Sequence, residues 1–177
     1  MYKESKMQRN ASGGPISQKP QKSLLKIIAD TREALPLDFT GFRDVESVRK
    51  GLKTGDYSIE NFEDSWVCER KSVQDLVGTL IGGHDRFLRE MERMKDFEVA
   101  YILVEHTPSI VYHYCTQHGW AAKFDTIIQS LLAYAYHYRV RVRFCKDRED
   151  MARYIVAKVR EFIKQKGEHN DNQKVQN

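Results

Sequence analysis

The order of apolar and polar positions along the chain predicts a mixed α/β protein. Short apolar or alternating runs are typical of strands, and here they cover residues 24–29, 57–60, 66–70, 99–104 and 140–144. Segments in which apolar residues recur every three or four positions predict helices over 72–80, 85–94, 108–118, 124–138 and 148–166. Because strand pairs come first and strands then alternate with helices, we expect a mixed central β-sheet flanked by helices.

The two ends of the chain lack this periodicity. Residues 1–23 contain a Ser-Gly-Gly-Pro run and few apolar positions, and residues 168–177 are almost entirely polar. Such segments cannot bury enough apolar surface to fold. We therefore expect a disordered basic arm over 1–23, one folded domain over 24–167 and a disordered tail over 168–177.

The net charge of the chain comes from the arm. Residues 1–23 carry five basic side chains and one acidic one, which equals the formal net charge of +4 for all 177 residues. The rest of the chain is neutral. A basic balance of this kind does not by itself indicate that the folded part binds nucleic acid.

Composition narrows the cellular setting. The chain is 41% hydrophobic, yet no run approaches the roughly 18 apolar residues of a membrane span, and no secretory leader opens the sequence. The three cysteines are an odd number at wide spacings, which indicates free thiols rather than a disulfide framework. We expect no membrane contact and an intracellular location: cytoplasm or nucleoid in a prokaryote or virus, nucleus in a eukaryote.

Acidic residues gather at predicted strand ends. Asp30 closes the first strand, Asp56 begins the second, and Glu69 lies near the end of the third with Lys71 two residues later on the same face. Carboxylates brought together in this way repel one another unless a cation lies between them. Hard oxygen ligands favour Mg²⁺ or Mn²⁺.

Each of these residues also has an ordinary structural role open to it. Asp30 and Asp56 can be turn residues, and Glu69 with Lys71 can be a surface cross-strand pair. Ser-Val-Gln-Asp at 72–75 fits a helix capping box, in which Asp75 would support the helix start. The largely apolar Trp-Val-Cys run before Glu69 argues for a buried strand and against the surface pair.

The combination resembles a known nuclease family. Gly-Asp-Tyr at 55–57, a short hairpin, and Glu-Arg-Lys at 69–71 followed by Asp75 resemble the GDY…ERKxxxD signature of XPF-type structure-specific endonucleases, a branch of the PD-(D/E)XK superfamily. Residues 30–33 match the upstream DxRE element, and 83–87 resemble a diverged Gly-Arg-Leu segment. The similarity covers residues 25–165.

The resemblance implies a restriction-endonuclease-like core and a divalent-metal-dependent DNA endonuclease. Its substrate would be branched, flapped or forked duplex DNA in repair or recombination. The catalytic residues that it implies are Asp30, Asp56, Glu69, Arg70, Lys71 and Asp75. Of these, Asp30, Asp56 and Glu69 would bind Mg²⁺ or Mn²⁺, and Lys71 would orient the attacking water. Arg70 leaves the opposite face of the strand, so we expect it to be a buried structural partner, paired with Glu33 or Asp75.

Contacts with DNA are expected from Arg32, Arg86 and Arg89. The three arginines of strand 139–144 are expected to form a solvated face or a charged edge that prevents aggregation. The closely spaced His113, Cys115 and His118 do not have the usual spacing of a zinc site.

Two further questions stay open at the level of sequence. Family members usually carry helix-hairpin-helix or helicase domains, for which this chain has no room, so we expect a stand-alone domain. A homodimer or heterodimer could form through the C-terminal helices, or the apolar, tyrosine-rich segment 127–138 could simply cover the sheet. A catalytically silent DNA-binding or scaffold subunit is the alternative function, and a recombination resolvase or restriction-like enzyme is a third.

Overall fold

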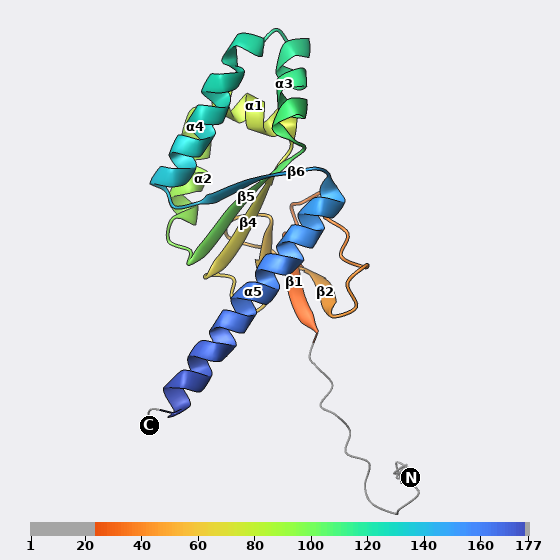
Figure 1. The fold of residues 1–177 in the computed structure, drawn as a ribbon, viewed down its shortest axis with the longest axis vertical. Coiled ribbons are helices and arrows are strands. Elements are labelled where there is room, and N and C mark those ends of the chain that lie inside the picture. Colours follow the sequence, from red (N-terminus) through yellow and green to blue (C-terminus); the bar gives the residue numbers. More distant parts are fainter. Residues whose placement is uncertain (1–23, 176–177) are drawn as a thin grey trace, which may run out of the picture.

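In the computed structural model, which describes residues 24–175, a six-stranded sheet carries helices on both faces (Figure 1). The strands are β1 (Leu25–Ala29), β2 (Val45–Arg49), β3 (Tyr57–Ile59), β4 (Trp66–Lys71), β5 (Val99–Glu105) and β6 (Arg141–Cys145). The helices are α1 (Val73–Gly82), α2 (His84–Met94), α3 (Pro108–Gln117), α4 (Phe124–His137) and α5 (Arg148–Val175), with a 3-10 turn at Ala121–Lys123.

The sheet is mixed, as the sequence predicts. Its strand order is β2-β1-β3-β4-β5-β6. β3 is antiparallel to both β1 and β4, while the pairs β1–β2, β4–β5 and β5–β6 are parallel. The carboxyl ends of β1 and β4 and the amino end of β3 therefore meet at one edge of the sheet.

Two apolar cores lie on the two faces of the sheet. Alternation along β4 sends Trp66 and Cys68 to the face that α5 covers, and Val67 to the face under α1–α4. Figure 1 shows α5 crossing the first face while the other helices gather on the far side. Packing on both faces accounts for the near-continuous apolar runs of β4 and β5.

The structure adds one strand that the sequence pattern does not predict. β2 reads Val-Glu-Ser-Val-Arg, in which the two valines are three positions apart and neither alternate with polar residues nor form an apolar run. It is an edge strand with mostly exposed side chains. Backbone pairing with β1 holds it in the sheet, and its side-chain pattern gives no sign of this pairing.

The expectation of a disordered tail over 168–177 is wrong for its first eight residues. In the structure α5 continues through Val175. The stretch has no proline, and a helix that has already formed is extended at the low cost of one residue per hydrogen bond. The expected basic arm over 1–23 and residues 176–177 lie outside the described residues.

The helix pair α1 and α2 begins as the sequence indicates. The Ser72 hydroxyl accepts a hydrogen bond from the Asp75 amide at 3.1 Å and donates to Asp75 Oδ2 at 2.7 Å, so Ser72 is the N-cap of α1 and the Asp75 carboxylate contacts it through the hydroxyl. Gly83 separates the two helices, and its amide donates to Thr79 O at 3.0 Å. α2 thus starts in a new direction, toward the edge of the sheet where Asp30, Asp56 and Glu69 lie.

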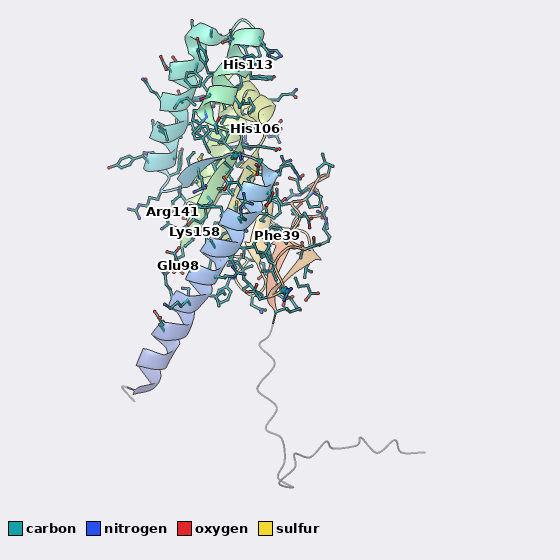
Figure 2. All side chains as sticks on the ribbon, turned by 45° about the vertical axis from the view of Figure 1, so that its right-hand side comes forward. Phe39, Glu98, His106, His113, Arg141 and Lys158 are labelled. Atoms are coloured by element: carbon teal, nitrogen blue, oxygen red, sulfur yellow. The ribbon has the colours of Figure 1, made fainter. Side chains whose placement is uncertain are left out.

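Arginines of β6 lie on the α5 face and contact aromatic rings. The Arg141 guanidinium lies 5.5 Å from the Tyr101 ring centre, and that of Arg143 lies 4.3 Å from the Tyr154 ring centre. Figure 2 shows Arg141 beside Lys158 of α5, and both line one shallow pocket. β6 is an edge strand of the sheet, so its arginines lie on a charged edge, which is one of the two arrangements expected of them; the ring contacts and an Arg143–Asp150 ion pair add a structural role.

None of the helices in the described part of the chain combines the length and the apolar character that crossing a bilayer requires.

Candidate active site

Backbone hydrogen bonds hold the three acidic strand ends together. The Asp30 amide donates to Asp56 O at 2.8 Å, and the Asp56 amide donates to Cys68 O at 2.9 Å. β1, β3 and β4 are therefore fixed side by side at the positions where Asp30, Asp56 and Glu69 emerge. The sequence-predicted convergence of these residues is what the structure shows.

The Gly-Asp-Tyr run has a steric explanation. Gly55 has φ of 77°, and a Cβ at this position would lie 2.3 Å from Val67 Cγ2, so no other residue fits without moving β4. Tyr57 is buried, and its hydroxyl accepts a hydrogen bond from the Leu37 amide at 2.8 Å. Between these two anchors, Asp56 is presented at the edge of the sheet.

A cleft of about 440 Å³ opens over this edge. Strand ends, the loop before Gly55 and one face of α2 form its walls. Its lining residues are Asp30, Arg32, Glu33, Ala34, Lys53, Thr54, Gly55, Asp56, Glu69, Arg86, Glu90 and Arg93. Five of these side chains are acidic and four are basic, so the cleft offers both carboxylate oxygens and positive charge.

The Glu-Arg-Lys run divides between the two faces of β4. Lys71 Nζ donates to Glu69 Oε1 at 2.8 Å, so both residues lie on the cleft side, as their spacing predicts. Lys71 is 7% exposed and also donates to both carboxylate oxygens of Glu90, at 3.0 and 2.9 Å. Burial lowers the pKa of Lys71, but the two glutamates outweigh it and raise the pKa, so the ammonium is retained.

Asp56 and Glu69 have raised pKa values, so their ionised forms are disfavoured in the absence of a cation. Burial raises the pKa of Asp56 to about 6, even though Asp56 Oδ2 accepts a hydrogen bond from the Arg70 amide at 2.8 Å. Burial, together with the neighbouring Glu90, raises the pKa of Glu69 well above its usual range. A cation placed between these two carboxylates would relieve the cost of their ionisation.

Asp30 is already fully engaged. Its Oδ1 accepts from the Arg32 amide at 2.7 Å and from Arg32 Nε at 2.8 Å, and its Oδ2 accepts from the Leu52 amide at 2.5 Å and Arg32 Nη2 at 3.2 Å. Burial raises the pKa of Asp30, but these hydrogen bonds prevail and lower it to about 2. Its four acceptor positions are occupied, which leaves no free lone pair for a direct bond to an ion.

Residues 24–175 contain no group of three or more His, Cys, Asp or Glu side chains placed to hold a metal ion. The donor chemistry nevertheless suits a hard divalent cation at Asp56 and Glu69. Both offer carboxylate oxygens, and both are held at the edge of the cleft by the backbone.

Arg70 lies on the opposite face and does not line the cleft. Its Nε and Nη1 reach Glu33 Oε2 at 3.1 Å and Glu105 Oε2 at 2.7 Å. Glu105 also approaches Arg148 at the start of α5, at 3.7 Å. The expected pairing with Glu33 is thus present, and the network joins β4, β5, α5 and the loop after β1.

We predict that Arg70→Met lowers the free energy of unfolding by about 3 kcal/mol, because two largely buried carboxylates lose their cation. Denaturant unfolding followed by circular dichroism measures the change. Arg160→Met is the matched control: it breaks a half-exposed ion pair with Asp44 and should cost less than about 1 kcal/mol. Equal losses in the two variants would contradict a structural role for the Arg70 network.

Of the remaining residues expected at the site, some line the cleft and others lie outside it. Arg32 and Arg86 line the cleft, but Arg89 is exposed outside it. Asp75 is also exposed outside the cleft, in the first turn of α1, where its carboxylate accepts a hydrogen bond from the hydroxyl of the N-cap Ser72. Lys71 lies behind the lining, against Glu69 and Glu90.

Sequence reasoning missed three charged residues of the cleft: Lys53, Glu90 and Arg93. A signal for two of them exists in the sequence. Arg86, Glu90 and Arg93 are spaced four and three residues apart, which places them on one face of a helix. Lys53 lies in an irregular loop, where no periodicity could have indicated its direction.

Comparison with known proteins agrees with this geometry. The family model described as ERCC4 domain matches residues 29–157, which is more than half of the chain. Among solved structures, XPF from Aeropyrum pernix in complex with DNA has a TM-score of 0.64 at 23% sequence identity, covering 80% of this chain and 66% of that chain. A second structure of XPF from Aeropyrum pernix has a TM-score of 0.62 at 23% identity and covers 76% and 60%.

The chain therefore spans about 60–66% of the length of these solved proteins. No curated protein is a significant match. The structural similarity confirms the expected restriction-endonuclease-like α/β fold, and the match over 29–157 confirms the resemblance drawn from the Gly-Asp-Tyr and Glu-Arg-Lys motifs. The chain belongs to the ERCC4 domain family.

Proposed function

We propose that this protein is a divalent-metal-dependent DNA endonuclease that hydrolyses phosphodiester bonds at branched, flapped or forked duplex DNA in repair or recombination. The observation that carries the proposal is the cleft in which Asp56 and Glu69 meet beside the Lys71 ammonium. Membership in the ERCC4 domain family supports it, as does the solved complex of an XPF with DNA.

The basic lining of the cleft suits a phosphate backbone. Arg32 and Lys53 line the cleft from the loops at the strand ends, and Arg86 and Arg93 line it from α2. Positive side chains in a cleft attract and orient DNA phosphates without reading base sequence. This agrees with a substrate recognised by its shape.

A divalent cation would be held by Asp56 and Glu69, with Asp30 acting through a water molecule because its own oxygens are engaged. When bound, Mg²⁺ or Mn²⁺ polarises the scissile phosphate and acidifies a water molecule. Lys71, fixed beside Glu69, would orient the attacking water and neutralise charge that develops on the phosphate. Asp56 and Glu69 would stay ionised in the presence of the cation.

Dimer formation through the C-terminal helices is also part of the proposal. One side of α4 covers the sheet with Ile127, Leu131 and Ala135, while Leu132 and Tyr136 on its other side are 50% and 90% exposed. Exposed apolar side chains at neighbouring positions are typical of an interaction surface. Sedimentation of the purified chain distinguishes a monomer from a dimer.

The proposed function is tested by incubating the purified chain with flap, fork, four-way-junction and linear duplex DNA. We expect cleavage in Mg²⁺, none in EDTA, and faster cleavage of branched than of linear DNA. Binding without cleavage in Mg²⁺ and in Mn²⁺ would overturn the enzyme in favour of a silent DNA-binding subunit. Equal cleavage of linear and branched DNA would overturn the structure specificity.

The raised pKa of Asp56 predicts an unusual dependence of stability on pH in the metal-free protein. Between pH 7 and pH 5 the folded protein takes up a proton on Asp56, whose pKa is about 6, while the unfolded chain, with a pKa of about 3.9, stays ionised. Stability contributed by this group therefore rises as the pH falls. Asp30 has the opposite shift and loses its contribution only below about pH 4.

We expect the melting temperature in EDTA to rise by about 3–6 °C from pH 7 to pH 5, which corresponds to about 1–2 kcal/mol. Asp56→Asn removes this group and controls for histidine titration, so its curve should be flatter. Mg²⁺ should stabilise the wild type more at pH 7 than at pH 5, because protons and cation compete for the same oxygens. Identical curves for the two proteins would contradict the shift.

A further inference from the structure

Glu90 of α2 is a buried acid that neither the sequence motifs nor the proposed chemistry explains. It is 8% exposed, and it reaches the cleft from a helix rather than from the strands that carry Gly-Asp-Tyr and Glu-Arg-Lys. Buried carboxylates are rare unless they are paired. Its partner therefore indicates what it does.

Its charged partner is Lys71, and the Glu69 carboxyl lies beside both groups. The ammonium of Lys71 donates to Glu90 Oε1 and Oε2 at 3.0 and 2.9 Å and to Glu69 Oε1 at 2.8 Å. An ammonium has three N–H donors; the two close oxygens of the Glu90 carboxylate share one of them and Glu69 takes a second, which leaves the third for a water molecule or a phosphate oxygen. The Lys71 side chain is only 9% exposed, and Glu90 holds this long and flexible group in one place.

The neighbours of Glu90 on α2 separate its role from DNA binding. Arg86 and Arg93 precede and follow it by one helical turn, and all three residues line the cleft. Glu90 is the residue of this set that contacts Lys71. A change at Glu90 should accordingly alter the position of Lys71 and leave the arginines in place.

We propose that Glu90 is a positioning residue, which fixes the Lys71 ammonium beside Glu69 before substrate arrives. The inference rests on the proposed function, in which Lys71 acts on the water and the phosphate. A group that is already ordered costs no further entropy when the reaction takes place. Glu90 acts on the reaction through Lys71 and does not itself touch the phosphate.

A double-mutant cycle on single-turnover cleavage tests this role. We expect Glu90→Gln to slow cleavage by at least about tenfold in the wild-type background, as for the loss of a supporting group, and to have no further effect in Lys71→Met. DNA affinity in EDTA should change less than about twofold, since no phosphate contact is lost. Glu92→Gln, an exposed change on the same helix, should match the wild type.

An equal loss in both backgrounds would show that Glu90 acts by itself, and the proposal would fall. Unchanged cleavage in Glu90→Gln would reduce Glu90 to a support of the fold. Lower Mn²⁺ affinity in this variant, measured by calorimetry, would make Glu90 a metal ligand and also overturn the positioning role.

A second readout does not depend on cleavage. With ¹⁵N-labelled lysine, the buried Lys71 ammonium should give a protected Nζ signal, which Lys71→Met identifies by removing it. In Glu90→Gln we expect the signal to be lost through faster exchange with water, because one shielding carboxylate has no charge. Persistence of the signal overturns the inference even if the wild type cleaves no DNA. Failure of the DNA panel with loss of the signal overturns the nuclease alone.

Discussion

Glu69→Gln is expected to reduce single-turnover cleavage of a branched duplex by at least about a thousandfold. The substitution keeps the shape of the side chain and removes the charge that would hold the cation. Its effect on stability should have the opposite sign to that of most point substitutions, which destabilise the fold. Because burial raises the pKa of Glu69, the ionised form costs the folded state free energy, so the melting temperature should stay equal or rise.

Three measurements separate this expectation from unfolding or loss of DNA. Calorimetry should show weakened Mn²⁺ binding, thermal melting should show a fold at least as stable, and fluorescence anisotropy in EDTA should show unchanged or tighter DNA binding. Glu63→Gln is the matched control, since Glu63 lies in the turn before β4 and pairs with Lys50 outside the cleft. Wild-type cleavage by Glu69→Gln would show that β4 does not carry the reaction.

Lys71→Met should slow cleavage by about a hundredfold or more, the scale for the loss of one preorganised electrostatic group. Methionine keeps the length of the buried side chain and removes its charge. Metal binding should persist or strengthen, because a protonated lysine cannot coordinate a cation and its positive charge opposes one nearby. Glu69 and Glu90 then face each other without their shared ammonium, so the metal-free protein should melt at a lower temperature.

Mn²⁺ calorimetry and single-turnover cleavage on the same preparation test this variant. Lys26→Met, a change at a half-exposed surface pair with Glu60, is the control and should affect neither measurement. Loss of metal binding in Lys71→Met would mean that Lys71 is needed to assemble the site. Unchanged cleavage would mean that Lys71 does not act on the phosphate.

The sequence predicts most strands and helices of this fold because its periodicities are strong and several ends are marked. Ser72 and Asp75 predict the start of α1, and the apolar run before Glu69 predicts a buried strand. β2 escapes prediction because an edge strand is held by backbone pairing that leaves no apolar pattern. The extension of α5 escapes it because continuation of a helix needs no favourable side-chain signal.

The sequence predicts those residues of the candidate site that lie at the ends of predicted strands. Asp30, Asp56 and Glu69 lie at strand ends, and strand ends that pair must meet. The sequence could not show that Asp30 would be saturated by Arg32 and Leu52, because that depends on side-chain rotamers and on a loop. Nor could it show that Glu90 would complete the site from α2, because helix-to-sheet docking is set by packing across the core.

In the Glu-Arg-Lys run of β4, the first and third residues serve the proposed catalysis and the second serves the fold, so the two should evolve differently. Glu69 and Lys71 leave one face of β4, where Glu69 lines the cleft and Lys71 lies behind it, while Arg70 leaves the other face and ties Glu33 to Glu105. In a descendant that no longer cleaves DNA but keeps the domain as a scaffold, catalysis no longer requires Glu69 and Lys71. The fold still requires Arg70. The expected trace of an inactive descendant is therefore a run that has drifted at 69 and 71 around an arginine retained at 70.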